Sequence, residues 1–486
     1  MAKFNATKAS AVEATKTVNL AGGEAYAQSA KLEFVSHLLT SFVGNQFYRT
    51  EDEGIKTLKN LIANISDNKF LAKAAIFARN EYGMRSVTHI VAAELAKKVK
   101  GESWTKDFFN KVVFRPDDMT EILAYYMSRY GKPVPNSLKK GLAKAFEKFD
   151  AYQIGKYRKE NGDIALVDVV NIVHPKATPI ITSLVKGELK SKDTWEASLS
   201  KAGQEASAKA ETAEEREEIV ADLKKDAWTE MVKSRKIGYM ALLKNLRNIL
   251  QNAPDAVDEA CAMLVEEKLV KTSKVLPFRF TTAMKEIEEI DNEGTRKIVK
   301  AINKAIDISL SNVPKFPGKT LVVVDNSGSM EGKPIEIASL FAAVIYKATD
   351  ADMMVFSDNA NYIKPNPDDS TVTIAKNIKD GCQQAGTNFH AIFNAASKKY
   401  DRIIILSDMQ GWMGHYTPKA EFEAYKNKHA ATPYIYSWDL AGQGTMQFPE
   451  KNVVALAGFS DKVFDIMGMV ETDKDALIKR IEAVVL

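Results

Sequence analysis

The sequence predicts a helical region followed by an α/β domain, in a chain of 486 residues. Three observations lead to this multidomain fold class. Apolar residues recur at helical spacing from Leu32 to Leu310, and no strand-like run interrupts them. The segment NVPKFPGK, residues 312–319, then breaks the pattern with two prolines and a glycine. Beyond it strand-like and helix-like segments alternate, so we expect two domains, residues 1–315 and residues 316–486.

The helical domain is predicted from a series of short amphipathic stripes. They lie at residues 32–42, 55–65, 87–99, 119–127, 138–149, 166–173, 240–250, 257–269 and 298–310. Short helices joined by turns over nearly three hundred residues favour a stack of helical hairpins over one compact bundle. Residues 190–225, rich in Ala, Glu, Lys and Ser, are expected to form an exposed helix or a mobile loop.

The second domain alternates buried strands with helices. The predicted strands are Thr320–Asp325, Met353–Ser357, Arg402–Asp408, Tyr434–Leu440 and Val453–Ala455, and the predicted helices span residues 335–347, 372–384 and 473–485. This alternation indicates a doubly wound parallel sheet with helices on both faces. In such a sheet, ligands bind at the carboxyl ends of the strands.

Five oxygen donors are expected at that edge of the sheet. Asp325, Ser327 and Ser329 lie in the turn DNSGS after the first strand, Thr387 precedes a helix, and Asp408 ends the strand RIIILSD. An all-oxygen set suits a hard divalent cation, and we expect Mg²⁺. An open coordination position would accept a carboxylate or phosphate of a partner. The alternative is a turn of small polar residues that binds no metal.

The enzyme motifs that we sought are missing. GSMEGK, residues 328–333, is one residue too short for a phosphate-binding loop, HExxH does not occur, and Ser327 lacks the GxSxG frame. The six histidines show no metal-ligand spacing, and His390, although close to Thr387, is expected on the surface of a loop or helix. We therefore expect no catalytic residues and no enzymatic activity.

Composition and charge indicate the compartment and the kind of partner. Cys261 and Cys382 form no disulfide framework, no apolar run approaches the ~18 residues of a membrane helix, and no secretory signal is present. We therefore expect a cytoplasmic protein that binds no membrane. Residues 1–315 hold 50 basic and 42 acidic residues, whereas residues 316–486 hold 17 and 21. A basic body with an acidic module would suit nucleic-acid binding combined with cation binding.

The segment of residues 137–177 combines the side chains that contact RNA. Lys144 and Lys148 lie opposite a buried apolar stripe, while Lys156, Arg158 and Lys159 alternate with aromatic and amide groups. Cations bind phosphates, and aromatic rings stack on bases. From spacing alone, the alternative is that the lysines are solvated and the aromatic residues belong to the core.

Several blocks of the chain resemble a known family. AFEKFDAYQIGKYR (145–158), DVVNIVHPKA (168–177), NLAGGEAYA (19–27), YMALLKNLRNIL (239–250) and LPFRFTTA (276–283) resemble the TROVE module of the Ro autoantigen family. The DxSxS turn, threonine and aspartate of the second domain resemble the metal-ion-dependent adhesion site of von Willebrand factor A domains. A TROVE module followed by an A domain is the order found in Ro proteins, so the resemblance covers essentially the whole chain.

The resemblance implies a bacterial or phage Ro-like RNA-binding protein. It implies a ring of HEAT-like helical repeats closed by the A domain, which binds small noncoding Y RNA on a basic outer surface. It also implies binding of single-stranded 3′ ends of misfolded RNA in the central hole, for RNA quality control. The family's Y RNA surface maps to His174, Lys156 and Arg158, and less directly to Lys144, Lys148 and Lys159. We also expect a monomer, with an exoribonuclease such as polynucleotide phosphorylase as a partner.

Two other functions remain open at this point. The first is a protein-interaction adaptor that binds an acidic side chain of a partner through the metal of the A domain. The second is a metal-assisted hydrolase in which Asp325 and Asp408 hold the ion, although the sequence offers no separate base.

Overall fold

The chain folds into two compact units. The computed structural model describes residues 16–19, 22–27, 29–40, 51–157, 164–189, 212–273, 275, 277–313, 315–381, 385–414, 417–440, 445–448, 453–457, 467–468 and 476–486. The first unit contains the residues up to Glu94 together with residues 314–366 and 375–486. The second contains residues 95–313 and 367–374. The predicted boundary between two domains at residue 315 stays a prediction. One boundary between the two compact units lies close to it, between Val313 and Pro314.

The first unit is built on a mixed six-stranded sheet. Its strands are β3 (Thr320–Asp325), β4 (Asp352–Phe356), β5 (Ala360–Ile363), β6 (Arg402–Ser407), β7 (Tyr434–Asp439) and β9 (Val453–Ala457), in the order β5-β4-β3-β6-β7-β9. All neighbours are parallel except β4 and β5. The doubly wound sheet and its five predicted strands are therefore confirmed, and β5 is an antiparallel edge strand that we did not predict.

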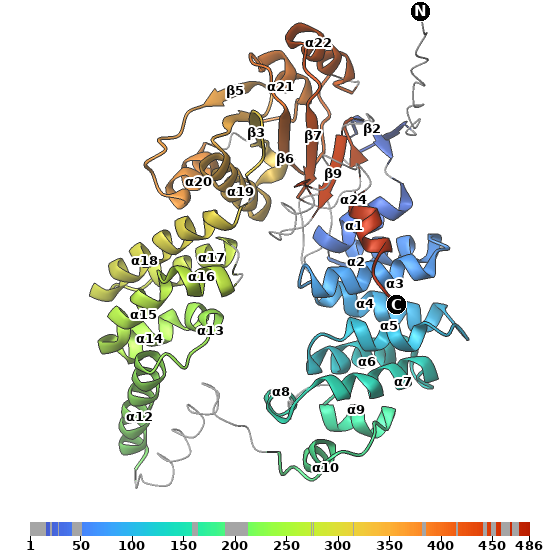
Figure 1. Ribbon diagram of the computed structural model, residues 1–486, viewed down its shortest axis with the longest axis vertical. Coiled ribbons are helices and arrows are strands. Elements are labelled where there is room, and N and C mark those ends of the chain that lie inside the picture. The colour runs from blue at the N-terminus through green and yellow to red at the C-terminus, as the bar shows by residue number, and fades with distance from the viewer. Residues whose placement is uncertain are drawn as a thin grey trace, which may run out of the picture. The chain divides into compact units, whose positions relative to one another are not determined.

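Helices cover both faces of this sheet (Figure 1). Leu321 and Val323 of β3 belong to a core formed with α21 (Phe389–Ala395) and α22 (Lys419–His429). The alternate residues of β3 point to the opposite face, where α19 (Lys333–Thr349) packs. On that face the rings of Phe341 and Trp438 lie 4.7 Å apart. The burial of β3 on both sides explains its continuous apolar run.

The N-terminal residues belong to the same unit as the sheet. β1 (Lys16–Val18) and β2 (Glu24–Ala27) form a small antiparallel sheet with β8 (Thr445–Met446). The helices α1 (Ala30–Thr40), α2 (Glu51–Asn64) and α3 (Asn68–Asn80) follow, and α4 (Ser86–Lys98) leads into the second unit. The last helix, α24 (Ala476–Glu482), packs against α3, and Lys31 Nζ lies 3.0 Å from Glu482 Oε1.

The second unit is helical throughout its described residues. Its helices are α5 (Thr105–Val112), α6 (Pro116–Tyr130), α7 (Asn136–Ala145), α8 (Ala151–Lys156), α9 (Leu166–Val173), α10 (Pro179–Val185), α12 (Ala213–Lys233), α13 (Tyr239–Lys244), α14 (Leu246–Asn252), α15 (Val257–Leu264), α16 (Glu267–Ser273), α17 (Pro277–Glu288) and α18 (Glu293–Ser309). α20 (Thr371–Asp380) begins in this unit and ends in the first. The predicted stripes thus lie on helices, and most of the predicted excursion, residues 190–211, lies outside the described residues.

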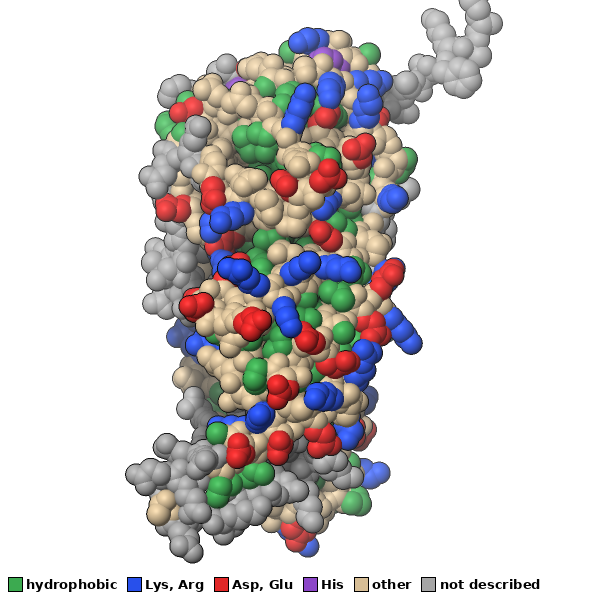
Figure 2. All heavy atoms as spheres, turned by 90° about the vertical axis from the view of Figure 1, so that its left-hand side faces the viewer, with side chains coloured by type: hydrophobic (Ala, Val, Ile, Leu, Met, Phe, Trp, Pro, Cys, Tyr) green, Lys and Arg blue, Asp and Glu red, His purple; other side chains and the backbone are tan. Residues whose placement is uncertain are grey.

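One face of the structure is mixed in charge. On the face that Figure 2 shows, basic and acidic side chains are interspersed. Exposed ion pairs such as Lys297–Asp258 (2.8 Å) are of this kind, and such pairs contribute little to stability. None of the described helices combines the length and apolar character that crossing a bilayer requires.

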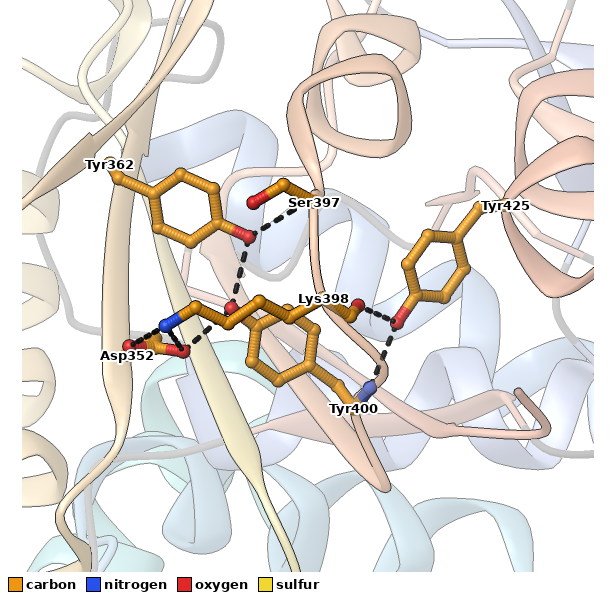
Figure 3. Close-up of polar contacts among 6 residues, drawn as sticks. All are labelled: Asp352, Tyr362, Ser397, Lys398, Tyr400 and Tyr425. Atoms are coloured by element: carbon orange, nitrogen blue, oxygen red, sulfur yellow. Dashed lines mark hydrogen bonds and ion pairs between the residues drawn. The ribbon is translucent and has the colours of Figure 1, made fainter. Parts of the chain in front are cut away.

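A polar network closes the amino-terminal edge of the sheet (Figure 3). The Tyr400 hydroxyl donates to Asp352 Oδ2 at 2.7 Å, and Lys398 Nζ donates to both carboxylate oxygens of Asp352 at 3.0 and 2.9 Å. The hydroxyls of Tyr362 and Tyr400 are 2.9 Å apart. Burial raises the pKa of Tyr400, so this hydroxyl stays a donor. The network joins the start of β4 to the segment just before β6. It therefore holds these two strands in position relative to each other.

Candidate functional site

Three loops meet at the carboxyl edge of the six-stranded sheet. Asp325 ends β3, Asp408 follows β6, and Thr387 lies just before α21. Backbone hydrogen bonds tie the loops together, because Gly328 N donates to Ala385 O at 3.1 Å and Trp412 N donates to Thr387 O at 3.3 Å. The structure therefore places the predicted metal-binding residues of three separate segments at one edge.

Hydrogen bonds orient the oxygen donors within this edge. Ser327 N donates to Asp325 Oδ1 at 3.0 Å, and the Ser407 hydroxyl donates to Asp325 Oδ2 at 2.5 Å. The hydroxyls of Ser327 and Ser329 are 3.3 Å apart, and Ser329 also hydrogen-bonds to Asp408. All five predicted residues are buried. Asp325, Ser327, Ser329 and Asp408 thus form one connected cluster, which Thr387 joins through its backbone.

The electrostatics of the cluster favour a cation. Burial raises the pKa of both Asp325 and Asp408, and the charge of Asp325 raises the pKa of Asp408 further. No lysine or arginine of the described chain pairs with either carboxylate. Two buried carboxylates beside two hydroxyls are a donor set that fits a hard divalent cation such as Mg²⁺.

One residue of this edge was missed by sequence reasoning. Asp439 ends β7 in register with Ser407, which bonds to Asp325, and Asp439 raises the pKa of Asp408 as one of its lesser influences. It stands at the carboxyl end of a strand that the sequence predicted. Applying the strand-end rule to every predicted strand would have found it.

The expectation that His390 is a surface residue is wrong. His390 lies on α21 with only 7% of its surface exposed, and its Nδ1 atom is 2.9 Å from Glu421 Oε2 on α22. His390 therefore lies between α21 and α22, beside the aromatic core, and has a structural role there.

Two of the six predicted RNA-binding residues have partners inside the second unit. Lys144 Nζ lies 3.2 Å from Asp107 Oδ1, and Lys148 Nζ donates to the backbone oxygens of Asn110 and Val113. All three partner residues lie on or just after α5. Burial lowers the pKa of Lys148 to about 8. Lys148 therefore caps the C-terminal end of α5, a role in which a lysine stabilises exposed carbonyls.

Lys156 and His174 are exposed at the ends of two neighbouring helices. Lys156 ends α8, which begins at a capping box in which Asp150 Oδ1 accepts from Gln153 N at 2.7 Å. His174 follows α9, and both helices pack against α10. Arg158 and Lys159 lie outside the described residues.

His174 has an unusual backbone conformation for its residue type. Its φ of 51° and ψ of 66° place it in the left-handed region, and its N–H donates to Val170 O at 2.9 Å. Glycine is the common residue at such a helix end, although histidine tolerates the region better than most side chains. The conformation directs an imidazole outward from a fixed point at the end of α9.

Sequence reasoning also missed the partner of Tyr157. The Arg115 guanidinium lies over the Tyr157 ring, 4.6 Å from its centre, and pairs with Asp117 at 2.6 Å. Tyr157 is therefore held against the start of α6, directly beside Lys156. Arg115 lies some forty residues before Tyr157 in the sequence, so no local pattern predicts this contact.

Comparison with known proteins identifies the family. The sequence matches the TROVE domain over residues 27–227 and 188–326, which together exceed half of the chain. The chain belongs to the TROVE family. Proteins of this family bind RNA, and the predicted resemblance is confirmed at this level.

The TROVE match is supported by relatives and by a solved structure. Telomerase protein component 1 of Rattus norvegicus is 23% identical over 296 residues, and that of Mus musculus is 22% identical over the same length. The match covers 46% of this chain but 11% of each relative. The Ro (RSR) protein of Deinococcus radiodurans superposes with a TM-score of 0.57 at 16% identity, covering 89% of this chain and 97% of that one. The TROVE protein therefore has the fold of a Ro protein, with helical repeats and an A-like domain.

Proposed function

We propose that this TROVE protein binds a small noncoding, Y-like RNA on the surface that carries Lys156 and His174. The observation that carries the proposal is the exposed imidazole of His174, held at a left-handed helix end where glycine is usual. No hydrogen-bond partner in the described chain uses this side chain. Lys156 and Lys176 add exposed positive charge on the same set of helices, α8 to α10.

The proposed mechanism is electrostatic capture without catalysis. Lys156 releases counterions from the RNA backbone, and His174 contributes hydrogen bonds and no acid–base step. A second mode of binding takes single-stranded 3′ ends of misfolded RNA in a central hole, as in RNA quality control. An exoribonuclease such as polynucleotide phosphorylase would then degrade the captured RNA, and the protein itself acts as a cytoplasmic monomer and not as an enzyme.

The test compares two labelled RNAs and two proteins. A structured RNA with a single-stranded 3′ tail is compared with the same RNA without the tail, for wild type and Lys156→Glu/His174→Ala. We expect tight binding by wild type, weaker binding of both RNAs by the variant, and a contribution of the tail that persists in the variant. Absence of binding to either RNA by wild type would overturn the proposal.

We further propose that the carboxyl edge of the sheet binds a divalent cation, with Mg²⁺ as the expected ion. Asp325, Ser327, Ser329, Thr387 and Asp408 would hold it. The support is the pair of buried carboxylates, whose mutual repulsion a cation would relieve. The ion would supply an open coordination position for an oxygen ligand and would order the three loops.

A second function is favoured by one feature of this edge. Trp412, on the loop that follows Asp408, is 48% exposed, and an exposed aromatic residue beside a metal site suits contact with a protein partner. As an adaptor, the protein would bind an acidic side chain of that partner through the metal. Metal-dependent capture of a protein, lost in Asp325→Asn, would support this function; capture that is insensitive to EDTA would contradict it.

A further inference from the structure

Two sequence blocks far apart in the chain line one pocket in the second unit. YMALLKNLRNIL forms α13 and α14, and LPFRFTTA forms the first part of α17. Side chains of these helices surround an open pocket of about 280 Å³, just below the usual size range of ligand sites. The function proposed above makes no use of these blocks.

The pocket walls rest on the hydrophobic core of the unit. Tyr239 and Phe280 are buried with their rings 6.2 Å apart, and the Tyr239 hydroxyl donates to Leu264 O at 2.8 Å. Their neighbours Met240 and Arg279 line the pocket. Core packing on one side therefore fixes the positions of the pocket residues on the other.

Positive charge dominates the pocket. Lys244, Arg247 and Arg279 line it, against the single carboxylate of Glu286. Arg247 pairs with Glu286 at 3.3 Å, but both side chains are about half exposed, and such a pair exchanges readily for a phosphate. Lys244 has no charged partner in the part of the chain that the structure describes. Three cations and one anion thus line the pocket.

Apolar surface lies beside this charge. Met240 is 36% exposed, and Leu243 and Ala283 continue the apolar lining of the pocket. A phosphodiester strand whose bases are unpaired offers both a charge for the cations and a flat apolar face for this lining. A duplex offers the charge alone, because its bases are stacked inside.

We propose that this pocket binds a nucleotide of single-stranded RNA. Lys244 and Arg279 contact its phosphates, and the base lies against Met240 and Ala283. The proposal rests on the RNA-binding function proposed above, and it assigns single strands to helices other than those that carry Lys156 and His174.

The test measures binding of a labelled oligouridine and of a tail-less RNA hairpin. In Lys244→Ala/Arg279→Ala we expect the affinity for oligouridine to fall at least tenfold and its salt slope to decrease by about 0.7 for each phosphate that the variant no longer neutralises. Hairpin binding stays unchanged. Met240→Ser weakens oligouridine binding without changing the salt slope. Lys304→Ala on α18 removes one exposed positive charge outside the pocket and serves as the control, with wild-type binding of both probes.

The outcomes separate this proposal from the general function. Failure of wild type to bind either RNA overturns the proposed function itself. Normal oligouridine binding by a folded Lys244→Ala/Arg279→Ala protein, alongside hairpin binding that depends on His174, overturns the pocket alone. An oligoglutamate peptide that displaces oligouridine at equal charge concentration would also overturn it, because the pocket would then recognise charge without a base.

Discussion

The Asn19 side chain donates from Nδ2 to the backbone oxygen of Gly411 at 2.5 Å, across 392 positions of sequence. Asn19 opens the turn between β1 and β2, and Gly411 lies three residues after Asp408. The turn residue Gly23 approaches the same loop so closely that an added Cβ atom would lie 2.1 Å from Gly411 O. The N-terminal hairpin thus supports the loop that carries Asp408, one of the two buried carboxylates at the carboxyl edge of the sheet.

Gly23→Ala is expected to displace this hairpin from the loop. The obstructing atoms are backbone, so the clash cannot be relieved by a side-chain rotation, and we expect a loss of about 1–3 kcal/mol. Gly238→Ala, where nothing lies within 4 Å of the added Cβ, should cost only a few tenths of a kcal/mol. Thermal unfolding of both variants checks the difference, and equal effects would show that the hairpin contact is not important.

Divalent cations are expected to stabilise the protein through the two carboxylates. At a concentration one hundred times the dissociation constant, the gain is about 2.7 kcal/mol. Asp408→Asn should abolish this gain and leave the metal-free protein at least as stable as wild type at pH 7.5, because one of two buried like charges is gone. Asp350→Asn, an exposed aspartate whose backbone is left-handed, is the matched control. The measurement is the melting temperature of each protein in Mg²⁺, in Mn²⁺ and in EDTA. If divalent cations raised the melting temperature of Asp408→Asn as much as that of wild type, the proposed site would be excluded.

The same pair predicts a pH dependence in EDTA. Burial raises the pKa of Asp325 to about 6 and that of Asp408 to about 7, from an ordinary value of 3.8. Between pH 4 and about 7 the folded state therefore holds protons that the unfolded state has released, so rising pH lowers the free energy of unfolding. Unfolding by urea should show this fall in wild type but not in Asp325→Asn/Asp408→Asn. Parallel pH profiles for the two proteins would contradict the assignment.

Substitutions of two nearby lysines are expected to have different effects, one on the stability of the protein and the other on RNA binding. Lys148→Met removes the cap from the carbonyls of Asn110 and Val113 and should cost about 1 kcal/mol. Lys156→Met removes an exposed charge and should change stability by less than about 0.5 kcal/mol. RNA affinity should fall more in Lys156→Met than in Lys148→Met. Urea unfolding and a binding titration of both variants check this, and the reverse order in either assay would be contrary to the structure.

The sheet, and the meeting of the polar residues at its carboxyl edge, could be predicted because their signals are local. Buried parallel strands such as Thr320–Asp325 are continuous apolar runs, and their polar ends mark the binding edge. The edge strand β5, with the sequence ANYI, has neither an apolar run nor clear alternation, so it gave no signal. The pairing of β2 with β8 joins residues more than four hundred positions apart, and no local pattern records it.

Side-chain partners were the hardest features to predict. The sequence pattern places Lys148 on the solvated face of a helix. In the structure its ammonium group donates to backbone carbonyls at the end of α5. His390 was expected at the surface because the sequence shows no partner for it, but Glu421 of α22 lies beside it. In both cases the partner comes from another helix, so the outcome depends on tertiary packing that spacing alone does not specify.

The central claim is that Lys156 and His174 form an RNA-binding surface, and a salt series tests it most directly. Binding of a tail-less structured RNA is measured at several salt concentrations for wild type, Lys156→Glu/His174→Ala and the control Lys304→Ala. The account predicts a steep fall of wild-type affinity with salt, with a slope of about −0.9 for each phosphate contacted, and a weaker affinity and shallower slope in the double variant. Wild-type affinity that does not change with salt, or that the double substitution leaves intact, would contradict it.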